Sequence, residues 1–276
     1  MPCFFLRRAG LYVAILGLVL AALVAGCSDD DSSIGPGPGG PVGPVGPVGP
    51  DGEDDGIPGS GTLTIQERIA KVDVVVIEQI VFRSEGEVTI SNGTPASLTI
   101  ETDDNLHQYL EATLRGTTLE ISTVDGIDIA PSEPPVFRVD VPDLRAVELA
   151  GAGTIDIGAI EADRFELALS GVGDVYIGTV TLDELVVSLS GVGTVSLTGS
   201  TDRQEVWVAG VTVYDAADLE SRTAAVTGAG TGQATIWVSE ELEITAADTA
   251  SVSYFGEPAV TQTLAGLATV TAQGAK

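Results

Sequence analysis

The stretch that decides the fold is LAGAGTI at 149–155, because the chain repeats it as LSGVGDV at 169–175 and LSGVGTV at 189–195. Weaker copies of the Gly-x-Gly element begin at Gly210, Gly230, Asp248 and Gly266, so successive copies are 18–20 residues apart. A fixed period of this length is typical of a solenoid with one coil per repeat.

The residues that flank each glycine element alternate between apolar and polar. Leu167 and Leu169, for example, alternate with Glu166 and Ser170. This period of two predicts a strand with one buried face on each side of a glycine corner. We therefore predict an all-β protein, a right-handed parallel β-helix with coils of 18–20 residues. An up-and-down barrel or a sandwich would also show the alternation, but neither explains the regular corner.

Glycine suits such corners because it adopts positive φ without steric cost. One coil cannot bury its apolar face alone, whereas coils stacked at about 4.8 Å share a continuous core. Leu169, Leu189 and Val208 are expected to stack inward, and acidic residues such as Glu166 and Asp183 to face water. The predicted structural turns are Gly151, Gly153, Gly171, Gly173, Gly191, Gly193, Gly210, Gly230, Gly232 and Gly266.

Residues 1–26 have the composition of a bacterial lipoprotein signal peptide. Arg7 and Arg8 precede an apolar run that ends at Gly26 and is shorter than a membrane-spanning helix requires. The sequence VAGC at 24–27 resembles a lipobox, which implies lipidation of Cys27. An uncleaved helical anchor is the alternative. Ser28 and the three aspartates after it resemble signals for the outer membrane and the cell surface of Gram-negative bacteria, although a solvated spacer would look similar.

Residues 27–61 are predicted to be a linker, first acidic and then rich in Gly and Pro. Glycines recur every third residue from Gly40 to Gly52, which is a collagen-like register, but five glycines make a very short triple helix. A disordered or semi-rigid stalk is therefore favoured. The β-helical domain is expected at 62–276, with its regular repeats at 149–276.

Charge and composition exclude several functions. The chain carries 40 acidic and 12 basic residues, a formal net charge of −28. Nucleic-acid binding depends on basic residues that neutralise phosphate, so no nucleic-acid partner is expected. Lys71 and Lys276 are the only lysines, and Cys3 and Cys27 the only cysteines. The Gly-x-Gly elements lack the third glycine of a dinucleotide fingerprint and open no helix, and we predict no cofactor.

Few residues are candidates for chemistry or binding. The single histidine, His107, is expected at the surface rather than in a catalytic pair. Asp156 and Asp174 follow their corners and could stack into an acidic ladder that attracts calcium, although a solvated face is favoured. Trp207 and Trp237 are expected to point outward and form a candidate binding face for sugars or another subunit.

The glycine turns at this period, together with the closing stretch VSYFGEP at 252–258, resemble the bacterial head-GIN-domain family over residues 69–272. The resemblance implies a fold like that of pectin-lyase-type β-helices and a role as an autotransporter-like adhesin, with no established catalytic residues. Thr212, Ala250 and Ala268 replace the second glycine of the element, and Asp248 replaces the first, so these corners are expected to turn differently.

Three functions are consistent with these features. We favour a non-enzymatic lipoprotein, held at the outer membrane by its lipid, on the cell surface or the periplasmic face. Its β-helix would present a binding surface for a polysaccharide or a protein, in adhesion or scaffolding. A carbohydrate-active enzyme on the same fold and a periplasmic sensor or regulatory partner are the alternatives. The triplet stalk and the open solenoid ends also raise the possibility of a homo-oligomer.

Overall fold

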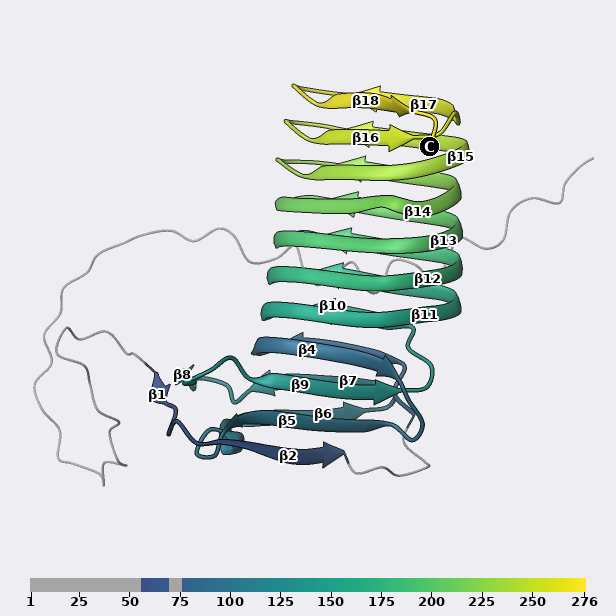
Figure 1. Ribbon diagram of the computed structural model, residues 1–276. Helices are drawn as coiled ribbons and strands as arrows, with labels where there is room; N and C mark the ends of the chain where they lie inside the picture. The colour runs from purple at the N-terminus through teal and green to yellow at the C-terminus, as the bar shows by residue number, and fades with distance from the viewer. Residues whose placement is uncertain (1–55, 70–75) are drawn as a thin grey trace, which may run out of the picture. The chain divides into compact units, whose positions relative to one another are not determined.

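The computed structural model describes residues 56–69 and 76–276, and within them the protein is an all-β solenoid (Figure 1). Cys27, the predicted signal peptide and nearly all of the predicted linker lie outside the described residues. No helix in the described ranges has the length and apolar content needed to cross a membrane.

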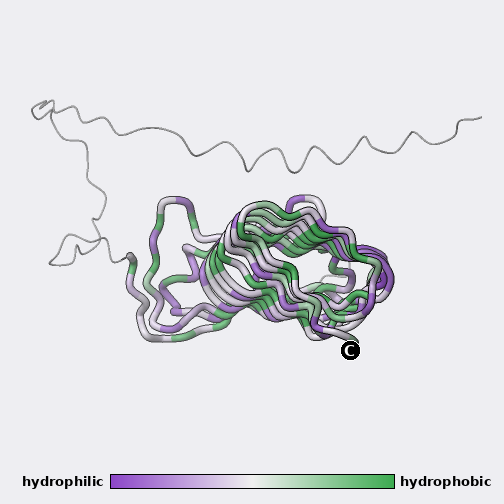
Figure 2. Tube along the Cα trace, turned by 90° about the horizontal axis from the view of Figure 1, so that it is seen from above, coloured by the Kyte–Doolittle hydropathy of each residue, from purple (hydrophilic) through white to green (hydrophobic). Residues whose placement is uncertain are grey.

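Five long parallel strands form the regular part of the stack. They are β11 (Ala152–Leu169), β12 (Val172–Leu189), β13 (Val192–Val208), β14 (Val211–Gly228) and β15 (Gln233–Ala246). Each strand pairs along both of its halves with the next strand, and seen along the stack each coil bends back on itself (Figure 2). We call the half that follows the glycine corner the first limb and the other half the second limb. The predicted fold and coil length are confirmed.

Both ends of the stack are built from shorter strands. Toward the C-terminus, β16 (Ser251–Phe255) and β18 (Thr269–Gly274) continue the first limb, and β17 (Ala259–Leu264) continues the second. Toward the N-terminus, β4 (Glu85–Asn92) and β9 (Val136–Val141) continue the first limb, while β10 (Ala146–Leu149), β3 (Gln79–Arg83) and β7 (Thr118–Thr123) continue the second.

Antiparallel strands close the N-terminal end. On the first limb β5 (Ser97–Asp103) pairs with β9 and with β2 (Leu63–Ile69), and on the second limb β6 (Leu110–Arg115) pairs with β7. A 3-10 helix at His107–Tyr109 joins β5 to β6. A separate two-stranded sheet joins β1 (Ile57–Pro58) to β8 (Ile129–Ala130), so pairing begins five residues before the expected domain start at 62.

The core consists of inward ladders of side chains that cross the coils. Leu169, Leu189 and Val208 pair in one ladder of the second limb and are buried, as predicted, and the buried Leu149 extends this ladder. The core also contains one polar chain. The Tyr214 hydroxyl donates to Gln204 Oε1 (3.1 Å), Gln204 Nε2 donates to Ser221 Oγ (2.7 Å), and Ser221 Oγ donates to the Trp237 carbonyl (2.7 Å). Because these buried groups satisfy one another, they lower the cost of keeping polar atoms away from water.

The glycine corners are of two kinds. In the earlier coils the second glycine has the unusual backbone, with φ of +145° at Gly153 and Gly173 and +149° at Gly193. A Cβ on Gly173 would lie 1.8 Å from the carbonyl oxygen of Gly153 one coil below, so no side chain fits. The same corner occurs at Gly86, which pairs with Gly153. The stack therefore contains one more glycine corner, at Gly86, which comes before the repeats predicted at 149–276 in the sequence.

In the later coils the first position of the element takes the left-handed backbone instead. Its φ is +70° at Gly210, +63° at Gly230, +56° at Asp248 and +69° at Gly266. The second position then has no positive φ, and it carries a side chain in three of these four coils. Thr212 is buried there, and its hydroxyl donates to the Ala209 carbonyl (2.8 Å). The departures from the glycine pattern thus mark a change of turn geometry.

Candidate functional site

The two tryptophans do not lie together. Trp207 is on the second limb, paired with Ser188 and Thr227, and 38% of it is exposed. Trp237 pairs with Glu220 at the far end of the first limb, where it is half-buried and the Lys276 Nζ lies 5.2 Å from its ring centroid. The structure therefore separates the residues that the sequence grouped as one face.

The expected acidic ladder is also not formed, because the register offsets its members. Asp156 pairs with Tyr176, whereas Asp174 pairs with Thr154 and accepts a hydrogen bond from the Thr194 backbone (2.8 Å). In the described ranges no group of three or more His, Cys, Asp and Glu residues could hold a metal ion.

His107 is buried, so the prediction of a surface histidine is wrong. Its Nε2 lies 3.0 Å from both the carbonyl oxygen and the hydroxyl of Thr64 in β2, and its Nδ1 has no hydrogen-bond partner among the described residues. Burial lowers the pKa of His107 below its usual value, and the Arg68 charge lowers it further against the opposing effects of Thr64 and Asp104. A neutral, enclosed imidazole packs the N-terminal end of the stack and faces neither of the pockets described below.

The outward residues of the two limbs differ in charge. On the second limb Arg164 pairs with Glu166 (2.9 Å) and Glu184, and Arg203 lies 3.9 Å from Glu184 and 3.7 Å from Glu205. On the first limbs of β11–β13, up to Thr198, the outward positions carry only two charged residues, Asp156 and Asp174, and neither of them forms an ion pair with a described residue. On β14 Asp215 and Asp218 follow, and Asp218 pairs with Lys276. We call this surface the first-limb face.

An exposed aliphatic ladder follows the corner edge of the first-limb face. Val172, Val192 and Val211 pair in successive coils, and their exposed fractions are 56%, 47% and 62%, respectively. They occupy the position between the two corner residues, where the side chain can only point away from the core. The sequence contains this signal as the central residue of each corner, but its exposure depends on the turn geometry.

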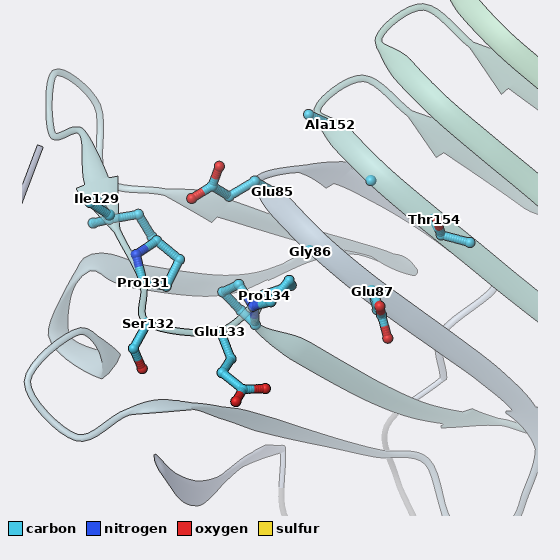
Figure 3. Close-up of a pocket in the computed structure, with 13 residues that line it drawn as sticks. Glu85, Gly86, Glu87, Ile129, Pro131, Ser132, Glu133, Pro134, Ala152 and Thr154 are labelled. Carbon is cyan, nitrogen blue, oxygen red and sulfur yellow. The ribbon is translucent and has the colours of Figure 1, made fainter. Parts of the chain in front are cut away.

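A pocket of about 580 Å³ continues this ladder toward the N-terminal end (Figure 3). It lies between the corner of β4 and β11 and the loop from Ile129 to Pro135, and Figure 3 shows Glu85 reaching toward that loop. Burial raises the pKa of Glu85, and the nearby charge of Asp128 adds to the effect. The carboxylates of Glu85, Glu87 and Glu133 make the pocket acidic.

The loop that lines this pocket is held by a buried carboxylate. Asp103 accepts hydrogen bonds from the backbone and the hydroxyl of Ser132 (2.8 and 2.7 Å) and from the Gly61 backbone (2.7 Å). Burial alone would raise the pKa of Asp103, but these hydrogen bonds outweigh it and lower the pKa below its usual value. The pocket is therefore a built part of the fold.

A second, smaller groove of about 420 Å³ lies where the first limbs end. It crosses β4, β11, β12 and β13 and is lined by Thr89, Ile90, Ser91, Asp156, Ile157, Gly158, Tyr176, Ile177, Gly178, Ser196 and Thr198. No sequence motif marks this groove, because it depends on small residues of neighbouring coils that come together only in the folded stack.

Comparison with known proteins gives one family and several similar folds. The sequence profile of the family described as "Putative auto-transporter adhesin, head GIN domain" matches residues 78–258. No curated protein matches the chain significantly.

Several solved structures have a similar fold. A putative adhesin from Bacteroides fragilis has a TM-score of 0.72 at 22% identity, covering 79% of this chain and 100% of its own. A putative lipid binding protein from Parabacteroides distasonis has a TM-score of 0.64 at 20% identity, covering 78% of this chain and 98% of its own. A putative adhesin from Parabacteroides merdae has a TM-score of 0.58 at 18% identity, with 78% and 98% covered. At these identities the likeness establishes the fold.

Proposed function

Because the chain belongs to the family described as "Putative auto-transporter adhesin, head GIN domain", we propose that it is a non-enzymatic adhesion protein of the cell envelope that binds its target with the first-limb face. The observation that carries this proposal is the exposed ladder of Val172, Val192 and Val211 on a protein with a net charge of −28. Exposed apolar patches on soluble proteins mark interaction surfaces. The second limb, where Arg164 and Arg203 pair with neighbouring glutamates, is better suited to contact with water.

We further propose that Cys27 carries the lipid that holds the domain at the outer membrane of a Gram-negative bacterium. The support comes from the lipobox-like VAGC at 24–27 and from the linker after it, which would hold the β-helix away from the membrane. Two or more acyl chains would make this anchoring stable.

Self-association through the C-terminal end of the stack is a related proposal. Residues 258–276 contain no acidic residue, and β17 and β18 are exposed, with Val260 and Leu264 on the open surface. An exposed strand edge without charged residues favours pairing with another chain. Sedimentation of the wild type and of Val260→Glu tests this, because only the wild type is expected to sediment as a dimer at high concentration. A monomeric wild type would contradict it.

The adhesion proposal is tested by attachment of bacteria that produce the chain to surfaces coated with mucin, envelope polysaccharide or matrix protein. We expect Val172→Lys combined with Val192→Lys to reduce attachment. The matched control, Ala168→Lys combined with Ser188→Lys, places the same charges on the second limb of the same two strands. Equal attachment by both double variants would refute a role for the first-limb face.

A further inference from the structure

The groove at the end of the first limbs has the chemistry of a sugar-binding site, and we propose that it binds a neutral glycan. This inference rests on the adhesion function proposed above and names the ligand class. The groove lies on the same face as the aliphatic ladder, across four neighbouring strands that are each about 4.8 Å apart. This spacing is close to the length of one hexose in an extended polysaccharide.

The groove is hollow because two glycines form its floor. A Cβ on Gly158 would meet no atom within 4 Å, so the space above this residue is open. A Cβ on Gly178 would lie 2.3 Å from the Gly158 carbonyl oxygen, so the stacking itself excludes a side chain there. The Thr198 hydroxyl donates to the Gly178 carbonyl and closes the groove on the next coil.

One aromatic ring and one carboxylate border this floor. Tyr176 is 44% exposed although it lies on a sheet, and Asp156 pairs with it from the coil below. Among the described residues neither the Tyr176 hydroxyl nor the Asp156 carboxylate has a hydrogen-bond partner. An aromatic ring offers an apolar face to the C–H groups of a sugar, and a carboxylate accepts hydrogen bonds from its hydroxyls.

The remaining lining groups fit the same ligand. Thr89, Ser91 and Ser196 add hydroxyls along the groove, and these can both donate and accept. The floor contains no basic residue, and the protein as a whole is strongly acidic. Polyanions such as uronic acid polymers would therefore be repelled, which excludes acidic glycans as the ligand.

Native gel electrophoresis of the full chain in gels containing laminarin, dextran or mannan tests the inference, with polygalacturonate as the anionic comparison. We expect at least one neutral polysaccharide to retard the wild type and polygalacturonate not to. Tyr176→Ala should weaken binding about tenfold, the loss typical of an aromatic contact at the centre of a binding site. Gly158→Val should abolish it, because the open space above Gly158 accepts a side chain without disturbing the stack.

Trp207→Ala is the matched control, since it removes an exposed aromatic residue from the opposite limb and should leave retardation unchanged. Retardation by polygalacturonate alone, by no polysaccharide, or equally in wild type and Gly158→Val would overturn the inference. The two proposals fail separately. If Val172→Lys with Val192→Lys reduces attachment but no neutral glycan binds, the first-limb face adheres to something else and only the glycan assignment is wrong.

Discussion

Replacing Gly173 by alanine separates the two reasons why the corners require glycine. Gly173 has a φ of +145°, and an added Cβ would lie 1.8 Å from the backbone oxygen of Gly153. A side chain in so sparsely populated a backbone conformation costs about 1–3 kcal/mol. The clash adds to this cost, because the obstructing atom is backbone held in the ladder between two coils. We expect a total loss of at least about 3 kcal/mol.

Two other glycines serve as controls for the separate effects. Gly116, between β6 and β7, has a φ of +66° with nothing within 4 Å of an added Cβ, so Gly116→Ala should cost only the backbone strain, about 1–2 kcal/mol. Gly158 has neither a positive φ nor a close neighbour, and Gly158→Ala should change the free energy of unfolding by no more than about 0.5 kcal/mol.

Urea denaturation of the three variants and the wild type gives the comparison, and hydrogen exchange locates the loss. Because each coil contacts only its neighbours, exchange in Gly173→Ala should accelerate most in β11, β12 and β13. If Gly173→Ala is no less stable than Gly116→Ala, the close approach of the coils does not determine which residues the corners accept, and our explanation of the repeat is wrong.

Three further predictions concern single side chains. The imidazole of His107, the only histidine, should titrate with a midpoint below its usual value of about 6.5, and an NMR midpoint at or above 6.5 would contradict this. The unfolded chain then binds a proton that the folded chain does not, so the free energy of unfolding should fall as the pH drops below about 6.5. Tyr214→Phe leaves Gln204 Oε1 buried without its donor, and should lower the free energy of unfolding in urea by about 1–3 kcal/mol, whereas Tyr254→Phe, at a half-buried tyrosine, should have little effect. Asp248 has a φ of +56°, and its Oδ2 accepts a hydrogen bond from the Gly230 backbone (3.2 Å). Asp248→Ala should be less stable than Asp248→Asn, because asparagine tolerates this backbone conformation and keeps an acceptor. Equal thermal midpoints for the two variants would argue against this explanation.

The sequence predicts the regular half of the fold well, because the same physical constraint recurs in every coil. The glycines of LAGAGTI and its copies are needed wherever two coils approach closely, so the repeat in the sequence is the repeat in space. The coil with its corner at Gly86 escaped prediction. Residues 93–151 separate its first limb, β4, from β11, the next first limb in the stack, and this removes the fixed period.

The candidate sites were harder to predict, because they depend on register and turn geometry. Asp156 and Asp174 follow similar glycines, yet they differ by two positions and so stack on Tyr176 and Thr154. Trp207 and Trp237 both point outward but belong to different limbs. The groove beside Tyr176 exists because Gly158 and Gly178 align across two strands, and nothing in either segment alone indicates that alignment.

The most direct test of the envelope adhesion function is protease treatment of intact cells that produce either the wild type or Cys27→Ala. We expect protease to remove the β-helical domain from intact wild-type cells, and the unlipidated variant to be released into the medium. A wild-type domain that remains protected until the outer membrane is breached would contradict adhesion at the cell surface.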